Sequence, residues 1–533
     1  MSITSISFAL FLCIVFILYY TVFAGKRQWI CLLLASIAFY VFSGPKNLVF
    51  LVLTALTCWG SALWMERWTL AYKSFRAAQK SENPEKADGN GASEYFSGMT
   101  VREAKAAAQK RKRSVLLLAL LLNFGVLALV KYWGVSYHGW LLPLGMSFYT
   151  FQALGYLIDV YNGKIRAERN FLHYFLFVSF FPQLVQGPIG RYDQLQTQLL
   201  GEHKASFEQW KRAMLLILFG LMKKYAIANV LAPAIAVLLD DNIRTIPGSA
   251  VVFAILMYSF QQYADFSGGI DIVTGAAQLF GIELAPNFRQ PYFSISLGDF
   301  WRRWHISLGA WMRDYVFYPF ALLKPVQKLG KMISKQFGKH LGVVLPASIA
   351  NILVFFLVGI WHGPEAHYIL WGLYNGIVIA VSDIGAPLFR SWNEKLHLKT
   401  ESRGMHLFRV ARTFVIVNIG WYFDRIYQFG DCMQAFAATF VPGRFQLAEL
   451  GTVIRCYLTE PGILTGKGML LVLLGMLVLL AADLLHEQKR TFYDVLAIRP
   501  RAVRWCCLYA LMLLVQLAID FSNASSAFMY ANF

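Results

Sequence analysis

The chain has 533 residues; 57% are hydrophobic, only 15% are charged, and the formal net charge is +19 at pH 7. Because soluble domains carry about a quarter charged residues, this composition excludes an ordinary soluble protein and predicts a polytopic membrane protein. The basic residues lie mostly in short segments between apolar runs and not in a basic folded domain, which argues against nucleic-acid binding. The sequence contains no Gly-Lys-Ser/Thr phosphate loop, so it does not indicate an ATPase.

Apolar stretches recur from end to end, and several approach the roughly 20 residues that a helix needs to cross a bilayer. They cover residues 6–23, 29–42, 48–63, 115–130, 214–239, 251–260, 343–360, 368–381, 410–421, 469–484 and 505–519. Two more, 141–160 and 174–185, are interrupted by Pro, Gly and polar residues. Irregular backbone at membrane depth is tolerated only inside protein or beside a cavity. We therefore predict an all-α polytopic membrane protein with roughly 11–13 transmembrane helices, plus re-entrant and interfacial helices around a central channel.

The flanking charges predict the orientation of the chain. Residues 1–23 lack a basic amino-terminal region and two further spans follow at once, so we expect a retained first span and not a cleaved signal peptide. Short cytoplasmic loops are enriched in Lys and Arg. Lys26 and Arg27 follow the first span, and residues 73–113 carry ten more basic residues after the third. This pattern predicts a multi-pass protein of the bacterial plasma membrane with an extracytoplasmic N-terminus.

Five regions follow from these patterns. They are N-terminal spans (1–65), a basic cytoplasmic loop (66–113), a core with the channel (114–385), a second basic loop (386–409) and C-terminal spans (410–533). Residues 81–99 have the polar, Gly-containing composition of a flexible linker, so we expect poor order there. Lysines recur at three- and four-residue spacing from Lys324 to Lys339. This spacing predicts a helix lying in the membrane surface, and the alternative is a solvated basic loop, because Pro325 and two glycines interrupt the pattern.

The cysteines and histidines do not have the spacing of a metal site. Seven cysteines form no regular framework, and several lie within apolar spans, where they are typical of small apolar residues. His362 and His367 are five residues apart across Pro364, which breaks the spacing that places two ligands on one helix face. We expect no bound metal.

Two histidines stand in aromatic, apolar surroundings. His305 lies within residues 300–315, and His362 follows the apolar run 352–361. Polar groups at membrane depth are rare and usually functional. The sequence around His362 offers no charge partner, so its imidazole is a candidate general base; the alternative is a histidine satisfied within the core. The neighbours of His305 include arginines and tryptophans, so an interfacial anchor is as good an interpretation as a reactive role.

Further polar residues occupy hydrophobic segments. Asp265, Ser267 and Asp271 lie in or beside one span, and Gln183 lies at the end of an interrupted one. Buried carboxylates are usually paired, so we favour a structural role for the two aspartates, either in an ion pair with a buried Arg or in capping a broken helix. A substrate channel is the functional alternative.

At these positions the sequence resembles membrane-bound O-acyltransferases of the bacterial alginate O-acetylation branch. The matching elements are residues 143–161, 180–189, 265–268, the block around His305, and the segments 361–363 and 370–374. The resemblance is close from residue 142 to about 381. In that family the histidine that matches His362 is catalytic, and the one that matches His305 is its companion. The chain departs from the family pattern at Gly309–Ala310, after Pro319, at Pro364–Glu365 and at Asn375, which leaves the acceptor open.

The resemblance implies an O-acyltransferase without a bound cofactor. It would move an acyl group, with acetyl expected, from a cytoplasmic thioester across the membrane for O-acetylation of an extracellular or cell-wall polysaccharide such as alginate. The donor would be acetyl-CoA or an acyl-carrier thioester, and an extracytoplasmic polysaccharide acetyltransferase would be the partner. His362 would act as the base and His305 would position or polarise the thioester. Substrate or channel residues would be Arg302, Arg303, Trp304, Asp314, Trp361, Gln183, Asp265 and Ser267.

Two other functions compete with this interpretation. One is the transfer of D-alanyl or another acyl group to teichoic acid, which members of the same family carry out. The other belongs to a different class, a membrane transporter or flippase, in which Asp265 and Asp271 would line a substrate or proton path. That class predicts an internal inverted repeat, and we find none by inspection of the sequence.

Overall fold

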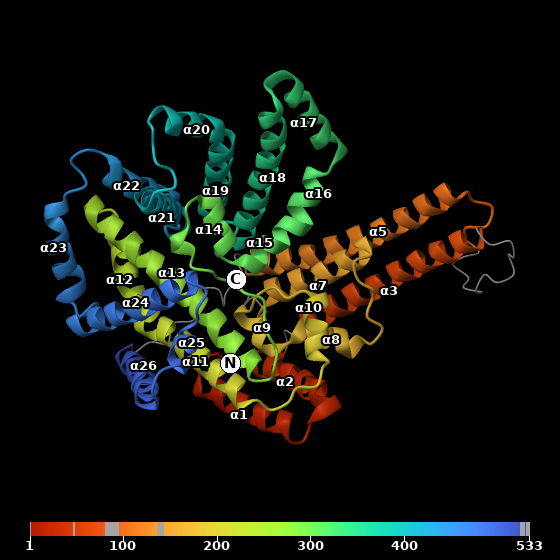
Figure 1. The fold of residues 1–533 in the computed structure, drawn as a ribbon, viewed down its shortest axis with the longest axis horizontal. Helices are drawn as coiled ribbons and strands as arrows, with labels where there is room; N and C mark the ends of the chain where they lie inside the picture. The colour runs from red at the N-terminus through yellow and green to blue at the C-terminus, as the bar shows by residue number, and fades with distance from the viewer. Residues whose placement is uncertain (1, 46–47, 80–94, 136–142, 523–527, 529–533) are drawn as a thin grey trace. The chain divides into compact units, whose positions relative to one another are not determined.

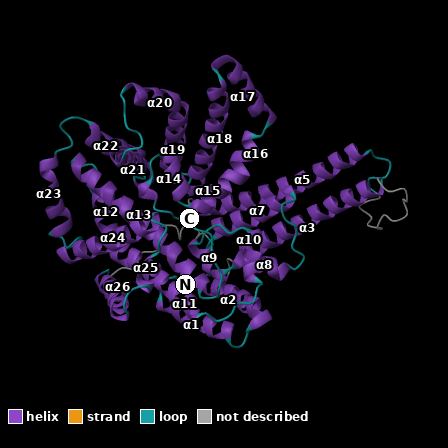
Figure 2. Cartoon of the chain, viewed as in Figure 1, coloured by secondary structure: helices purple, strands orange, loops and turns teal. Residues whose placement is uncertain are grey.

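The computed structural model describes residues 2–45, 48–79, 95–135, 143–522 and 528. Within these ranges the regular elements are helices and no strand occurs (Figure 2). The predicted class, an all-α multi-pass membrane protein, is confirmed. The chain divides into two compact units. The first unit comprises Met1–Ser206, Ala277–Leu284 and Ala531–Phe533, and the second comprises Phe207–Ala276 and Ala285–Tyr530.

The first unit contains the N-terminal helices, drawn from red to yellow in Figure 1. They are α1 (Ile6–Tyr20), α2 (Gln28–Ser43), α3 (Leu48–Ala78), α5 (Val101–Ala128), α7 (Met146–Asn162), α8 (Phe171–Ser179), α9 (Phe181–Gln186) and α10 (Tyr192–Leu199). Helix α3 packs against both α5 and α7. The interrupted segments of the sequence correspond to α7, α8 and α9, of which α8 and α9 are too short to span a bilayer.

The second unit contains the remaining helices. They are α11 (Phe207–Met222), α12 (Asn229–Ala236), α13 (Gly248–Gln278), α14 (Leu297–Arg303), α15 (Ile306–Met312), α16 (Tyr318–Ala321), α17 (Lys324–Phe337), α18 (Lys339–His362), α19 (Ala366–Ile384), α20 (Ala386–Lys395), α21 (Arg403–Arg425), α22 (Phe429–Phe440), α23 (Leu450–Val453), α24 (Gly466–Glu487), α25 (Phe492–Ala497) and α26 (Arg501–Phe521). Helices α17, α18 and α19 pack side by side in chain order, so α18 lies between two neighbours along the sequence.

Six helices in the described residues are long and apolar enough to cross a membrane. These candidate spans are Leu48–Ala78, Val101–Trp133, Phe207–Asp241, Lys339–His362, Gly466–Glu487 and Arg501–Phe521, and a seventh is counted if α19 and α20, which are bent by 54°, form one span. Several of the predicted spans are shorter helices; α1 has 15 residues and α2 has 16. The larger count of 11–13 therefore stays a prediction.

The basic segment 66–113, expected as a loop, is helical at both described ends. Helix α3 continues to Ala78, and α5 begins at Val101. Alanine, lysine, arginine and glutamate favour helix, and a capping box between Thr100 and Glu103 starts α5. Most of the predicted linker, residues 80–94, lies outside the described residues.

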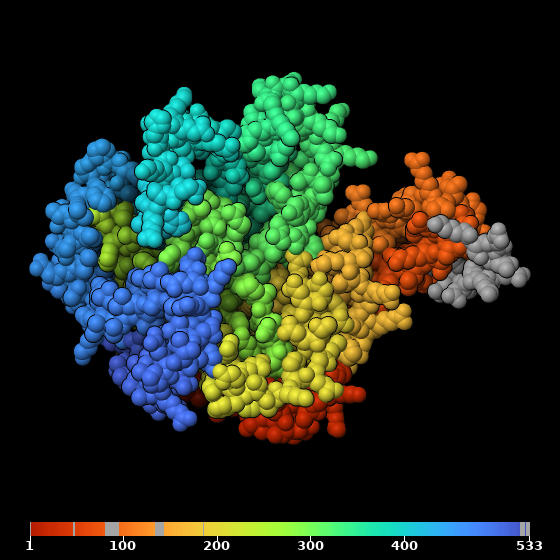
Figure 3. Space-filling model, in the orientation of Figure 1, coloured from red at the N-terminus to blue at the C-terminus, as the bar shows by residue number. Residues whose placement is uncertain are grey.

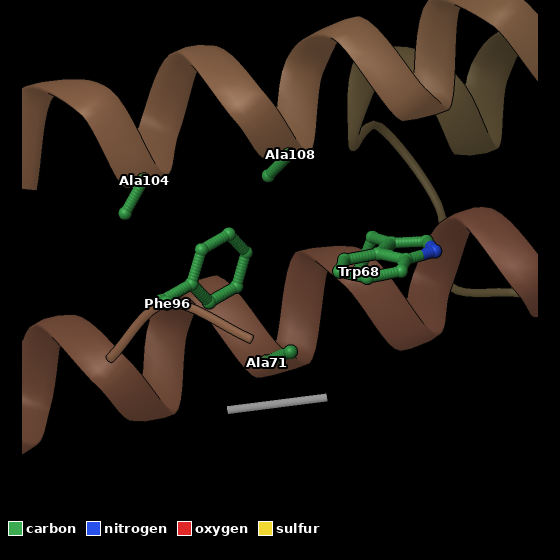
Figure 4. Close-up of a cluster of buried hydrophobic side chains, with 5 residues drawn as sticks. All are labelled: Trp68, Ala71, Phe96, Ala104 and Ala108. Carbon is green, nitrogen blue, oxygen red and sulfur yellow. The ribbon is translucent and has the colours of Figure 1, made fainter. Parts of the chain in front are cut away.

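The ends of α3 and α5 form a helical hairpin with its own core. Figure 4 shows its buried side chains, which are Trp68, Ala71, Phe96, Ala104 and Ala108. The small alanines of α5 leave room for the aromatic rings. The guanidinium of Arg111 lies 4.3 Å from the ring centroid of Trp68 and 4.1 Å from that of Tyr95, so cation–π contacts close the cluster.

The lysine-rich segment is helical, which excludes the loop alternative: four of its lysines lie in α17, and Lys339 begins α18. All five lysines of the run are exposed. On another face, Gly330 and Gly342 bring the backbones of α17 and α18 together, because a Cβ on Gly330 would lie 2.8 Å from the carbonyl oxygen of Gly342. The location of α17 in the membrane surface stays a prediction.

Candidate active site

His305 lies at a sharp junction between α14 and α15. It adopts the left-handed conformation, with φ 47° and ψ 52°, which is uncommon outside glycine. The preceding strand-like segment holds this junction in place: Arg289 N donates to Arg303 O at 2.9 Å, and Ile306 N donates to Asn287 O at 3.0 Å. The backbone of residues 287–289 thus fixes the direction of the His305 side chain.

The side chain of Asn287 determines which imidazole nitrogen of His305 is basic. Asn287 Oδ1 accepts hydrogen bonds from Ser307 N at 3.1 Å and Ser307 Oγ at 2.8 Å, and it lies 3.2 Å from His305 Nδ1. Because this oxygen is an acceptor, we assign the proton to Nδ1 and the lone pair to Nε2. Burial lowers the pKa of His305 to about 3, so the ring is neutral at physiological pH.

His362 is the last residue of α18 and is surrounded by aromatic rings. Its ring centroid lies 4.9 Å from that of Trp361, 5.0 Å from that of Trp371 and 5.6 Å from that of Tyr368. The Trp361 ring also lies 6.4 Å from the ring of His305. The Trp361 indole therefore lies beside both imidazole rings.

Glycines allow α18 and α19 to approach closely enough to build this cluster. A Cβ on Gly372 would lie 2.3 Å from Phe355 O, and a Cβ on Gly359 would lie 2.5 Å from Tyr368 O. Both distances are shorter than van der Waals contact, so a larger residue would separate the helices. Small residues serve the same purpose where membrane helices pack closely. The close contact brings Trp371 of α19 against His362 of α18.

Both histidines line one cavity of about 1140 Å³ in the second unit. Its walls also include Gln262, Trp301, Arg302, Trp304, Phe355, Trp371, Trp392 and Trp421. Figure 3 shows a recess between α20 and the pair α17 and α18, and residues of α18 and α20 line the cavity. The cavity is thus largely apolar, with several aromatic rings and two imidazoles in its wall.

Four arginines add positive charge to the cavity: Arg302, Arg313, Arg409 and Arg412. The Arg302 side chain is 72% exposed and its nearest carboxylate contact, with Asp299, is 3.7 Å long, so the guanidinium is accessible to a ligand. Arg303 differs from Arg302. It is paired with Asp299 at 3.2 Å and Glu487 at 2.5 Å, and it is absent from the cavity lining.

Comparisons with known proteins agree with this arrangement. The profile of the membrane-bound O-acyltransferase family (MBOAT) matches residues 164–423, which include both histidines and most of the cavity. The chain is similar to this family over these residues. The predicted resemblance to the alginate O-acetylation branch is confirmed as well.

Three similar proteins indicate the kinds of reaction found among the chain's relatives. The chain is 33% identical over 315 residues to a probable alginate O-acetylase AlgI of Pseudomonas syringae pv. tomato, covering 58% of the chain and 54% of the relative. It is 30% identical over 370 residues to a peptidoglycan O-acetyltransferase of Helicobacter pylori, covering 62% and 65%. A teichoic acid D-alanyltransferase of Bacillus subtilis is 29% identical over 293 residues, covering 54% and 69%. The matched part thus spans little more than half the length of the alginate O-acetylase.

Two of the predicted channel residues, Asp265 and Ser267, lie outside the cavity lining. Asp265 Oδ1 pairs with Lys224 Nζ at 2.6 Å, and Asp271 Oδ2 pairs with Lys223 Nζ at 2.5 Å. Ser267 Oγ accepts from Lys223 Nζ at 2.9 Å. The aspartates are therefore in ion pairs, as favoured from the sequence, but the predicted arginine partner was wrong: the partners are lysines. Two adjacent lysines within an apolar run were the signal that could have identified them.

Three other predicted residues have different surroundings. Gln183 belongs to the first unit, where its Nε2 donates to Pro188 O at 2.6 Å. Gly187 and Gly190 pack directly against Gln183, where a Cβ would clash. Asp314 pairs with its neighbour Arg313 at 2.9 Å and does not line the cavity, although Arg313 does. Trp361 contacts both histidine rings without lining the cavity itself.

The sequence interpretation missed several polar residues that organise the site. Asn375 Oδ1 accepts from Trp301 Nε1 at 2.9 Å, and Asn375 Nδ2 donates to Trp371 O at 2.8 Å. Asp424 accepts from Gln262 Nε2 at 3.0 Å behind the cavity wall. Their signal in the sequence is a carboxamide or carboxylate within an apolar helix. Asn287, eighteen residues before His305, has no such local signal.

No group of three or more His, Cys, Asp or Glu residues that could hold a metal occurs within the described ranges.

Proposed function

We propose that the chain transfers an acyl group, acetyl in the first instance, from a thioester donor to a hydroxyl group of an extracellular or cell-wall polysaccharide. The observation that carries this proposal is that His305 and His362 line the same largely apolar cavity. The similarity to a probable alginate O-acetylase and to a peptidoglycan O-acetyltransferase supports the reaction class and the kind of acceptor. The name of the teichoic acid D-alanyltransferase supports acyl transfer with a different acyl group.

His362 acts as the general base in this mechanism. Its imidazole takes the proton of the acceptor hydroxyl as that oxygen attacks the thioester carbonyl carbon. A C–O bond forms and the carbonyl becomes an oxyanion. When the oxyanion collapses, the C–S bond breaks and the leaving thiolate takes the proton from the His362 imidazolium. The products are the ester and the thiol, and His362 is neutral again. The indoles beside His362, Trp361 and Trp371, are buried and limit the access of water to the donor at this point.

His305 has a positioning role in this mechanism. Because Nδ1 carries the proton toward Asn287 Oδ1, Nε2 is left as a hydrogen-bond acceptor. An acceptor cannot polarise a carbonyl oxygen, which requires a donor. His305 Nε2 therefore accepts a hydrogen bond from a substrate hydroxyl or amide N–H and orients it. Another group has to polarise the carbonyl oxygen of the thioester.

The donor carries phosphate groups, which we assign to the arginines of the cavity. Guanidinium groups bind phosphate oxygens in a bidentate manner. Arg302 is the most suitable of the predicted residues, because it is exposed and lines the cavity, whereas Arg303 is already paired. Acetyl-CoA and a phosphopantetheine carrier both meet this requirement.

The location follows from the chemistry of the two substrates. A thioester donor is made in the cytoplasm and the polysaccharide lies outside, so transfer through a multi-pass protein of the bacterial plasma membrane connects them. An extracytoplasmic polysaccharide acetyltransferase would then receive the acyl group. The basic segments near Lys26 and within residues 66–113 support a cytoplasmic face there and an extracytoplasmic N-terminus.

The test measures thiol release from acetyl-CoA by the purified full-length protein with its acetyltransferase partner and polysaccharide. We expect His362→Ala to lower turnover by roughly 100- to 10,000-fold, the range for loss of a general base, with normal expression. His367→Ala is a matched control, because His367 is also buried nearby but bonds Phe423 O and does not line the cavity. Wild-type turnover in His362→Ala would exclude its role as the base.

His305→Ala separates positioning from anchoring. If His305 positions a substrate, the variant stays in the membrane at normal amounts and loses turnover. If His305 is an interfacial anchor, the amount of membrane protein falls and turnover per molecule is kept. Quantifying the protein in membranes beside its specific activity distinguishes the two.

A further inference from the structure

Trp371 contributes a buried hydrogen-bond donor beside His362. The residue is 2% exposed and lines the cavity, and its ring lies 5.0 Å from the His362 ring at an angle of 67°. Its indole Nε1 is buried without a hydrogen-bond partner in the part of the chain that the structure describes. Leaving a buried donor without an acceptor is unfavourable, because the group loses its hydrogen bond to water. Such groups are rare in native proteins and call for an explanation.

The surrounding residues hold the indole in place without using its N–H group. Asn375 Nδ2 donates to Trp371 O at 2.8 Å, and the ring of Trp301 packs edge-on against the indole at 5.3 Å. The only side-chain oxygen of Asn375 is occupied by Trp301 Nε1. Gly372 fixes the backbone beside Trp371 through its close contact with Phe355. The neighbourhood therefore orders the ring and leaves the N–H for an acceptor that a substrate brings.

The proposed reaction generates such an acceptor. The hydroxyl that His362 deprotonates attacks the carbonyl carbon of the thioester. Negative charge then develops on the carbonyl oxygen. His305 does not supply a donor there, because its proton faces Asn287. Donors that are held in place in a water-excluded site stabilise such an oxyanion strongly, since no reorganisation is needed during the reaction.

We propose that the Trp371 indole N–H donates a hydrogen bond to the oxyanion of the tetrahedral intermediate formed beside His362. This assignment rests on the proposed acyl transfer and adds a catalytic residue to it. The carbonyl oxygen gains its charge only after attack, so the bond strengthens in the transition state. It should therefore affect kcat more than the KM for the donor.

Trp371→Phe removes the N–H and keeps an aromatic ring. We expect kcat to fall about 100- to 1000-fold, as for loss of one oxyanion donor, with the KM for acetyl-CoA unchanged within about threefold. The melting temperature should stay the same or rise, because the deleted donor has no partner to lose. Trp68→Phe is the matched control: its Nε1 is also buried without a partner among the described residues, but it lies on α3 and not in the cavity lining.

Three outcomes distinguish the assignments. A large fall in kcat for Trp371→Phe alone, at normal melting temperature, supports the oxyanion role. A wild-type kcat in Trp371→Phe, or a loss that parallels a lower melting temperature, overturns it while leaving acyl transfer intact. If the wild-type protein releases no thiol and His362→Ala changes nothing, the proposed function itself fails, and that result is independent of Trp371.

Discussion

At the scale of single residues, the two histidines have different environments and so different roles. His362 is packed among the aromatic rings of Trp361, Tyr368 and Trp371. His305 is instead oriented by Asn287, whose side-chain oxygen faces Nδ1 and the first turn of α15. A residue far from any sequence motif thus decides what His305 can do.

Asn287→Ala tests this dependence. The variant removes the acceptor that fixes the His305 tautomer and also caps Ser307 N. We expect it to lower stability by about 1–2 kcal/mol through loss of the cap, and to lower turnover by roughly 10- to 100-fold, as expected for a lost hydrogen bond of about 1–3 kcal/mol. Thermal unfolding in detergent and the thiol-release assay measure the two effects.

Ser307→Ala is the control for Asn287→Ala. It removes the hydroxyl that donates to Asn287 Oδ1 and leaves the His305 contact in place. We expect a small loss of stability and little change in turnover. If Ser307→Ala and Asn287→Ala lose turnover equally, the tautomer of His305 is not what Asn287 contributes.

The sequence predicted the residues with unusual chemistry and missed those that hold them. His305, His362, Arg302 and Trp304 were predicted and line one cavity. Asn287 was not predicted, because its contacts arise from a tertiary turn and not from helical spacing. The same holds for the partners of buried charges. Asp265 was identified as a polar residue in an apolar span, but its partner Lys224 lies forty-one residues earlier and could not be predicted from local sequence.

At the scale of elements, the close packing of α18 against α19 brings the residues of the site together. Gly359 and Gly372 place the two backbones in direct contact, and the flanking residues His362 and Trp371 then meet. Any side chain at either glycine would require the helices to move apart. Activity should therefore be more sensitive to these glycines than the overall fold is.

Gly372→Ala makes that prediction specific. The new Cβ would lie 2.3 Å from Phe355 O, and overpacking of this kind typically costs about 1–3 kcal/mol. We expect turnover to fall at least tenfold, because a 1 Å misplacement of reacting groups can cost about 100-fold, while the protein remains in the membrane. Gly404→Ala is the matched control, since a Cβ there meets no atom within 4 Å. Equal turnover in both variants would contradict the packing argument.

Helix boundaries were less predictable than helix existence. Hydropathy identified the apolar parts of α3 and α5, but both helices continue into the basic segment that was expected to be a loop. Hydropathy reports burial in lipid and says nothing about where the helix ends. The capping box at Thr100 and the alanine-rich run after it were the local signals for the true start of α5.

At the scale of the whole molecule, the chain divides into two units that do not follow the predicted regions. Residues Ala277–Leu284 group with the first unit although they are flanked on both sides by the second. This grouping depends on contacts such as the hydrogen bond from Tyr19 Oη to Phe280 O at 3.1 Å. A pairing of residues so far apart in sequence has no local pattern, so sequence reasoning cannot supply it.

Charge, by contrast, predicts a property of the whole molecule directly, its orientation in the membrane. Helix α3 has 31 residues and is about 46 Å long at 1.5 Å per residue. This exceeds the hydrocarbon core of about 30 Å, so one end extends into water. The end with Lys73 and Arg76 is the basic one and is expected in the cytoplasm. The opposite end, near Pro45, is then expected outside.

Cysteine labelling tests this orientation. In a variant without the seven native cysteines, Lys105→Cys on α5 and Pro45→Cys before α3 place single thiols at exposed positions. A membrane-impermeant maleimide should label Pro45→Cys in intact spheroplasts, and it should label Lys105→Cys only after permeabilisation. The reverse pattern would place the basic hairpin outside. That result would contradict the predicted cytoplasmic location of the basic segment and the predicted extracytoplasmic N-terminus.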